Sequence, residues 1–102
     1  MYFTYIIRCK DNSLYTGYTS DIVRRMDEHK KGINSKYTRA KGFEKLEVFF
    51  ECSTRSKAMK LECFIKKLNR NGKLWLISNP YLFIEELEDK EGIIVGKIND
   101  KS

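Results

Sequence analysis

The sequence predicts an α+β domain with a small three-stranded antiparallel sheet flanked by three helices. Its length of 102 residues suffices for one core. Short runs rich in β-branched and aromatic residues, typical of strands, are joined by turn residues. Longer segments begin with capping residues and repeat apolar side chains at helical spacing. The expected strands are 2–9, 13–19 and 45–52, and the expected helices are 20–31, a segment ending near Asn69, and 71–79.

The first two strands are expected to form a hairpin, and its register decides where the tyrosines point. An odd loop, such as 11–13, places Tyr5 on the same face as Tyr15 and Gly17, whereas an even loop separates Tyr5 from Tyr15. We favour the odd register because Asn12 tolerates the left-handed conformation that such loops need. Gly17 would then leave space beside two hydroxyl groups.

The first helix is expected to be capped by Thr19 or Ser20, with Asp21 in its first turn at the positive end of the helix dipole. It should end at Gly32, after two lysines. Residues 32–44 contain two glycines and three basic residues without a clear period, and we interpret them as an ordered, exposed loop.

The second helix is expected to begin after Ser53, Thr54 or Ser56. Its apolar side chains fall on one arc at ~100° per residue. The members of this arc are Ala58, Leu61, Phe64, Ile65 and Leu68.

The third helix, at 71–79, should close the core and end at Pro80. Its expected core residues are Leu74, Trp75 and Ile77. The sequence then divides into a domain at 1–79 and a partly ordered extension at 80–102. Two apolar patches in the extension could form an additional C-terminal hairpin.

Composition indicates a soluble globular chain, with 41% hydrophobic and 33% charged residues. No apolar run approaches the roughly 20 residues that span a bilayer, and no signal peptide is evident, so a cytoplasmic protein without membrane contacts is expected. Cys9, Cys52 and Cys63 form no CxxC pair and are expected to be buried, reduced thiols.

Charge is unevenly distributed along the chain. Residues 1–79 carry 17 Lys and Arg against 8 Asp and Glu, a balance of +9, whereas residues 80–102 carry 3 against 6, a balance of −3. A basic body favours a polyanionic partner, most often nucleic acid. A lysine-rich surface that serves only solubility remains the alternative.

Three kinds of side chain could meet around a phosphate. Arg25 and His29 are four residues apart and therefore neighbours on one helix face. Glu62 lies at the edge of the apolar arc, where a carboxylate is expected to be paired or bound to a cation. It could pair with Lys66 or hold a divalent ion with several waters. The tyrosines and the histidine could equally be structural.

Five segments follow one another along the chain: "FTY" (3–5), "YTG" (15–17), "TSDIVRRMDEH" (19–29), "KYTR" (36–39) and "LECFIKKL" (61–68). In their order and spacing they resemble a GIY-YIG nuclease domain of the small, single-domain bacterial branch. The resemblance covers about residues 2–78. Phe3 stands where the family has its first glycine, Thr16 where it has isoleucine, and Tyr18 where some relatives have lysine.

The resemblance implies catalytic roles for Tyr5, Tyr15, Arg25, His29 and Glu62. It implies phosphodiester hydrolysis with one Mg²⁺ or Mn²⁺ held by Glu62. Tyr15, or less readily Tyr5, would help deprotonate the attacking water, and Arg25 would neutralise charge on the phosphate while His29 assists. Gly17 would have a structural role.

Nucleic acid, DNA or RNA, is the expected partner. Lys36, Tyr37 and Arg39 are expected to contact backbone and bases, with Arg24 as a further phosphate contact. No motif suggests sequence recognition, so a role in DNA repair or processing with low sequence specificity is expected. The alternative is a nucleic-acid-binding module with little or no cleavage. The apolar patches of the extension could serve a protein partner.

Overall fold

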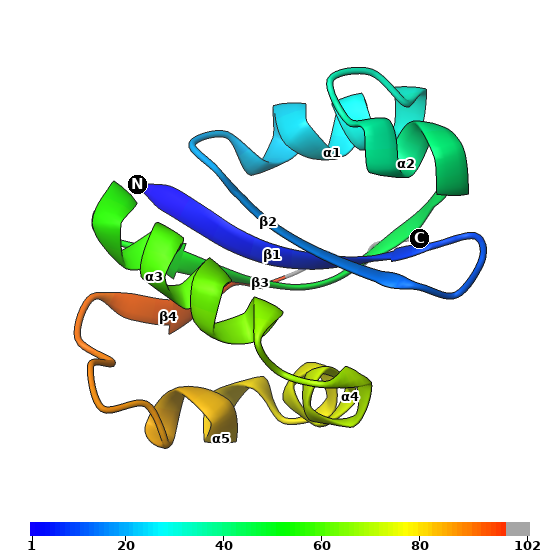
Figure 1. Ribbon diagram of the computed structural model, residues 1–102. Coiled ribbons are helices and arrows are strands. Elements are labelled where there is room, and N and C mark those ends of the chain that lie inside the picture. The colour runs from blue at the N-terminus through cyan, green and yellow to red at the C-terminus, as the bar shows by residue number, and fades with distance from the viewer. Residues whose placement is uncertain (98–102) are drawn as a thin grey trace.

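Four antiparallel strands form the centre of the fold in the computed structural model, which describes residues 1–97 (Figure 1). They lie in the order β2-β1-β3-β4. The α+β class and the antiparallel sheet are confirmed, with one strand and two helices more than expected. The strands are β1 (Tyr2–Cys9), β2 (Leu14–Thr19), β3 (Phe43–Cys52) and β4 (Ile93–Val95), and the helices are α1 (Ile22–Lys31), α2 (Lys36–Lys41), α3 (Arg55–Lys66), α4 (Arg70–Ser78) and α5 (Pro80–Glu85).

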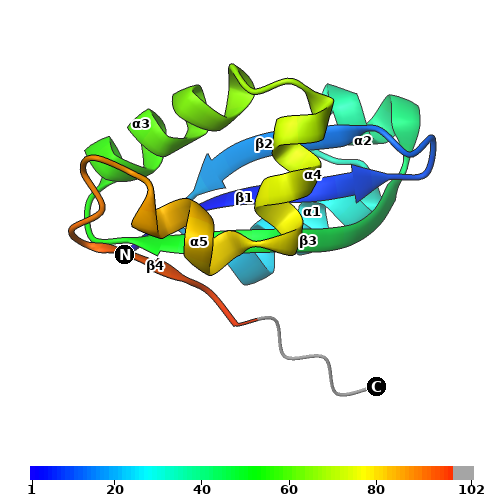
Figure 2. The ribbon, with the colours of Figure 1, turned by 90° about the horizontal axis from the view of Figure 1, so that it is seen from below.

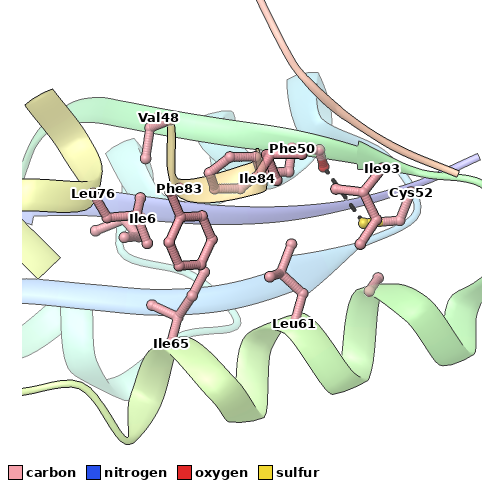
Figure 3. Packing of buried hydrophobic residues seen from close by; sticks show 11 residues of the cluster. Ile6, Val48, Phe50, Cys52, Leu61, Ile65, Leu76, Phe83, Ile84 and Ile93 are labelled. Carbon is pink, nitrogen blue, oxygen red and sulfur yellow. Dashed lines mark hydrogen bonds between the residues drawn. The ribbon is translucent and has the colours of Figure 1, made fainter. Parts of the chain in front are cut away.

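The helices cover both faces of the sheet. Figures 1 and 2 show α1 and α2 on one face and α3, α4 and α5 on the other. Because side chains alternate along a strand, Ile6 enters the larger core beside α3, whereas Tyr5 and Ile7 enter a smaller cluster beside α1. In the larger core, shown in Figure 3, Leu61 and Ile65 of α3 pack with the strand residues. The sheet thus separates the larger core from the face that carries Tyr5 and Tyr15.

The hairpin of β1 and β2 has the odd register, as expected. Tyr5 pairs with Gly17 and Ile7 with Tyr15. The loop spans 10–12 rather than 11–13, because Cys9 N–H already bonds Ser13 C=O at 2.9 Å. Asn12 supplies the left-handed residue, with φ of 71°.

The first helix begins with a different cap from the one expected. The Asp21 carboxylate accepts the N–H of Arg24 at 3.0 Å, so Asp21 is the N-cap. Thr19 does not cap the helix, since its hydroxyl accepts the Asp21 N–H instead, and Ser20 precedes the cap. Gly32 ends the helix in the left-handed conformation, with φ of 68°, as predicted.

The expected loop at 32–44 contains a helix and the start of a strand. Ser35 caps α2 by accepting the N–H of Thr38, and β3 begins at Phe43, two residues before the expected start. A six-residue helix is too short to show a repeated apolar face, which is why its sequence indicated no period.

The cap of α3 is Thr54, one of the three candidates, and Asn69 caps α4. Two expected core residues are largely exposed: Phe64 of α3 at 47% and Trp75 of α4 at 41%. Leu76 is the buried residue of α4. Ile77 packs against the larger core as expected, so the error concerns Trp75, whose place in the core is taken by Leu76.

Residues 80–97, the described part of the extension, pack onto the domain and form no hairpin of their own; residues 98–102 lie outside the described part of the chain. Pro80 not only follows α4 but begins α5. At the first position of a helix a backbone N–H would have no partner within the helix, so the missing N–H of proline costs no hydrogen bond there. Phe83 and Ile84 of α5 enter the larger core. The second apolar patch supplies β4, which pairs with β3 through Phe50 and Val95.

The cysteines are free thiols. Cys9 and Cys52 are buried as expected, whereas Cys63 is exposed on α3 and corrects that part of the prediction. Among residues 1–97, no helix is long and apolar enough to cross a membrane.

Candidate active site

The Tyr5 hydroxyl is the centre of the candidate site. Its side chain is buried, and its oxygen lies 2.8 Å from His29 Nε2 and 3.3 Å from Arg25 Nε. Gly17, opposite Tyr5 across the hairpin, makes this position available: a Cβ at residue 17 would lie 2.6 Å from the hydroxyl oxygen. The sequence-predicted pair of Arg25 and His29 therefore meets a phenol from β1.

The hydrogen bonds form a directed chain. Arg25 Nε–H can only donate, so the Tyr5 oxygen accepts this bond and its own proton is free for His29 Nε2. His29 Nδ1 lies 3.1 Å from Thr38 Oγ1, which fixes the second side of the ring. This order assigns the His29 proton to Nδ1 and leaves Nε2 as the acceptor.

Burial keeps both members of the Tyr5–His29 pair neutral. Desolvation raises the pKa of Tyr5 to about 12, although the hydrogen bond from Arg25 opposes the shift. Desolvation lowers the pKa of His29 to about 4, and the nearby charge of Arg25 adds to the shift. At pH 7 the pair is therefore a phenol facing a neutral imidazole whose Nε2 accepts the hydrogen bond of the phenol.

The Arg25 guanidinium is held on two of its nitrogens. Besides the Nε bond to Tyr5, Nη1 donates to Glu28 Oε1 at 3.0 Å and to the Asn34 carbonyl at 3.1 Å. The Asn34 side-chain amide in turn donates to Glu28 Oε2 at 3.0 Å. Within the part of the chain that the structure describes, Nη2 of Arg25 makes no hydrogen bond, so it can face a ligand.

Tyr15 joins the cluster through ring contacts. Its ring centroid lies 5.7 Å from that of His29 and 4.9 Å from that of Tyr37. Lys41 Nζ lies 5.6 Å from the Tyr37 centroid, within cation–π range. The three aromatic residues connect α2 to the candidate site.

Glu62 forms the ion pair with Lys66 that was one of its two expected environments, and its role as a metal ligand stays a prediction. Its side chain is only 16% exposed, and Oε2 lies 3.5 Å from Lys66 Nζ. Its negative charge also acts on Tyr5, whose pKa it helps to raise. No group of three or more His, Cys, Asp or Glu that could enclose a metal occurs in residues 1–97. Glu62 can thus offer one carboxylate to a cation that keeps most of its water.

Comparison with known proteins places this arrangement in a family. Residues 1–74 match the model of the GIY-YIG catalytic domain. The chain belongs to the GIY-YIG family. Family membership confirms the resemblance drawn from the triplets around Tyr5 and Tyr15, and it indicates a nuclease family.

Small bacterial proteins are similar to this chain over nearly their whole length. The UPF0213 protein FN1575 of Fusobacterium nucleatum is 39% identical over 97 residues, which cover 95% of this chain and 97% of that protein. The UPF0213 protein lmo0166 of Listeria monocytogenes is 46% identical over 89 residues, 87% of this chain and 93% of that one. The solution NMR structure of the UPF0213 protein BH0048 from Bacillus halodurans has a TM-score of 0.51 at 39% identity, covering 86% of this chain and 98% of that chain.

The four residues expected to contact nucleic acid differ in burial. Tyr37 is half-buried against Tyr15, whereas Arg24, Lys36 and Arg39 are exposed. In the part of the chain that the structure describes, none of the three exposed cations bonds to Tyr5. Their contribution to nucleic-acid binding stays a prediction.

Sequence reasoning missed three residues that complete the site: Glu28, Asn34 and Thr38. Glu28 could have been found, because it follows Arg25 by three residues on the same helix face. Asn34 and Thr38 could not, since residues 32–44 show no clear period and predict only an ordered, exposed loop.

The His29 pKa predicts how stability depends on pH. Because the pKa falls from 6.5 to about 4 on folding, only the unfolded chain binds this proton between these values. The contribution of His29 to the free energy of unfolding is therefore fully present above pH 6.5. It decreases as pH falls towards 4, by at most about 3 kcal/mol. The unfolding free energy of wild type and His29→Gln is measured with urea between pH 7 and 4.5. It should decrease less steeply with falling pH in the variant. Equal decreases in both proteins would contradict the lowered pKa of His29.

Proposed function

We propose that this protein is a metal-dependent endonuclease that hydrolyses phosphodiester bonds in DNA, or in RNA, with low sequence specificity. The observation that carries the proposal is the Arg25–Tyr5–His29 hydrogen-bond chain in a member of a nuclease family. A fixed guanidinium, a phenol and a neutral imidazole are the groups needed to hold a phosphate and to move a proton from water.

Arg25 would stabilise the charge that develops on the phosphate. Its Nε and Nη1 groups are already bonded, so the guanidinium is held in place before a ligand arrives. A planar group that never loses its charge and needs little reorientation suits a phosphoryl transition state.

Tyr5 would receive the proton of the attacking water and pass its own proton to His29. A phenol with a pKa of about 12 is not ionised at pH 7, so direct action as a phenolate is unfavourable. Transfer along the 2.8 Å bond to His29 Nε2 avoids that ionisation. A bound phosphate would favour it, because a negative charge near His29 raises its pKa. Tyr15, packed on His29, would orient the water.

Glu62 would hold Mg²⁺ or Mn²⁺. A single half-buried carboxylate fits an ion that retains several waters, as Mg²⁺ usually does. The ion would supply charge stabilisation at the leaving oxygen. Lys66, now 3.5 Å from the carboxylate, is exposed and can move away.

Residues 1–79 would contain the whole catalytic apparatus. Arg24, Lys36 and Arg39 would contact backbone phosphates, and Tyr37 would stack on a base. Residues 80–102 would serve stability and, through exposed apolar side chains such as Tyr81 and Leu82, a protein partner. A role in DNA repair or processing fits an enzyme that selects structure rather than sequence.

A non-cleaving nucleic-acid-binding module is the second candidate. The observations that favour it are that residues 1–97 contain no group of three or more potential metal ligands and that the pKa of the Tyr5 phenol is raised rather than lowered. A weak base beside a weakly held cation could leave binding intact and chemistry slow.

Cleavage assays distinguish the two functions. Branched, nicked and single-stranded DNA and RNA are incubated with Mg²⁺, Mn²⁺ or EDTA. We expect metal-dependent products from the wild type and a loss of at least about 100-fold for Glu62→Gln with binding retained. The matched control is Glu88→Gln, an exposed acid of the extension. Tight binding without any metal-dependent product would favour the module.

A further inference from the structure

We propose that Glu28 and Asn34 form a clamp that positions the Arg25 guanidinium to receive a phosphate. The proposal rests on the proposed function, in which Arg25 acts on the scissile phosphate. Glu28 is then a positioning residue: it acts through Arg25 and touches neither substrate nor metal.

Four hydrogen bonds build the clamp. Glu28 Oε1 and the Asn34 carbonyl accept from the same nitrogen, Arg25 Nη1, at 3.0 and 3.1 Å. Asn34 Nδ2 donates to Glu28 Oε2 at 3.0 Å, which orients the carboxylate. With the Nε bond to Tyr5, the guanidinium plane is defined by contacts on two nitrogens. Asn34 therefore holds Glu28, and both hold Arg25.

The backbone places Asn34 for this task. Gly32 ends α1 in the left-handed conformation, and its N–H returns to the His29 carbonyl. The Ile33 N–H bonds the Glu28 carbonyl at 3.0 Å, so the chain folds back over the last turn of the helix. Asn34 is itself left-handed, with φ of 56°, which directs its carbonyl towards Arg25. The turn after α1 thus brings the Asn34 carbonyl into hydrogen-bond contact with Arg25.

Burial separates this pair from an ordinary surface ion pair on the same helix. The side chains of Arg25 and Glu28 are 19% and 20% exposed, whereas those of Lys31 and Asp27 are 63% and 56% exposed. A long arginine side chain has many rotamers in water, and a clamp removes that freedom before the substrate binds. The Asp27–Lys31 pair does not restrict the Arg25 side chain, so it provides a matched comparison on the same helix.

Two measurements on purified protein test the clamp: the rigidity of the Arg25 side chain and the affinity for an oligonucleotide. The NMR order parameter of the Arg25 Nε–H group should lie near the rigid value of about 0.85 in wild type and in Asp27→Ala, and fall below about 0.6 in Glu28→Ala. Asn34→Gly keeps the left-handed backbone and its carbonyl, so it should give an intermediate value. Binding of a short phosphorothioate oligonucleotide, measured in parallel, should weaken by no more than a few-fold in Glu28→Ala.

Kinetics then test positioning for the reaction. Glu28→Ala should lower kcat by about 10- to 100-fold with little change in KM, because misplacement of a catalytic group affects mainly the chemical step. The loss should vanish in the Arg25→Ala background, which a general effect on folding would not do. Glu28→Gln, which can still accept from Nη1, should recover part of the rate.

The outcomes separate this proposal from the proposed function. A wild-type protein that never cleaves contradicts the nuclease, while the order parameter still decides whether the clamp exists. An Arg25 side chain equally rigid in Glu28→Ala and wild type overturns the clamp. Cleavage that is lost in Arg25→Ala but normal in Glu28→Ala overturns positioning and leaves the nuclease standing.

Discussion

Replacing Arg25 by alanine should lower phosphodiester cleavage by about 10²- to 10³-fold, the largest effect expected at the site. The guanidinium is the one cation bonded to the Tyr5 hydroxyl within residues 1–97, and its fork cannot be copied by an ammonium group. Arg25→Lys should therefore lose nearly as much activity as Arg25→Ala. Single-turnover cleavage at saturating protein measures the chemical step.

The control for this prediction is Lys31→Ala, which removes one exposed positive charge from the same helix. It should cleave like wild type, because its ion pair with Asp27 is solvated. Circular dichroism should show an unchanged fold for all three variants. Equal activity of Arg25→Ala and Lys31→Ala would remove Arg25 from the mechanism.

Gly17→Ala is expected to abolish most activity and to lower stability by about 1–3 kcal/mol. The added Cβ would lie 2.6 Å from the oxygen and 2.8 Å from Cζ of Tyr5, whose side chain is buried and bonded at its tip. Tyr5 would have to leave its position against His29 and Arg25. Urea unfolding and cleavage assays on the same samples measure both losses.

A second glycine provides the comparison for Gly17. A Cβ at Gly72, in helix α4, would meet no atom closer than 3.3 Å. Gly72→Ala should therefore be close to neutral, because the small shift that a contact of 3.3 Å with Leu68 Cβ requires is offset by up to about 1 kcal/mol of helix propensity. If Gly17→Ala behaved like Gly72→Ala, the close contact with Tyr5 would not be what requires a glycine.

Local patterns in the sequence predicted the elements whose signals are local. Turn residues and β-branched runs located β1 and β2, and Asn12 selected the odd register that aligned Tyr5 with Gly17. Gly32 marked the end of α1. Of the missed elements, α2 is too short to show a helical period, and β4, with three residues, is defined by its pairing with the distant strand β3.

The candidate site could be predicted only in part, because local patterns in the sequence do not show which distant residues meet. Helix spacing put Arg25 and His29 on one face, which the structure confirms, but it could not show that Tyr5 joins them. Glu62 was ambiguous between a salt bridge and a metal ligand, and the family resemblance decided the interpretation. Thr38 lay outside any pattern because its role depends on the position of His29.

Paramagnetic relaxation by Mn²⁺ tests most directly whether Tyr5, Arg25 and Glu62 surround one catalytic centre. Addition of substoichiometric Mn²⁺ to ¹⁵N-labelled protein should broaden the resonances around Glu62 first and those of Tyr5 and Arg25 next. Glu62→Gln should abolish this pattern. Broadening centred on the acidic residues of the extension, such as Glu88 and Asp89, and unchanged by Glu62→Gln, would contradict the account.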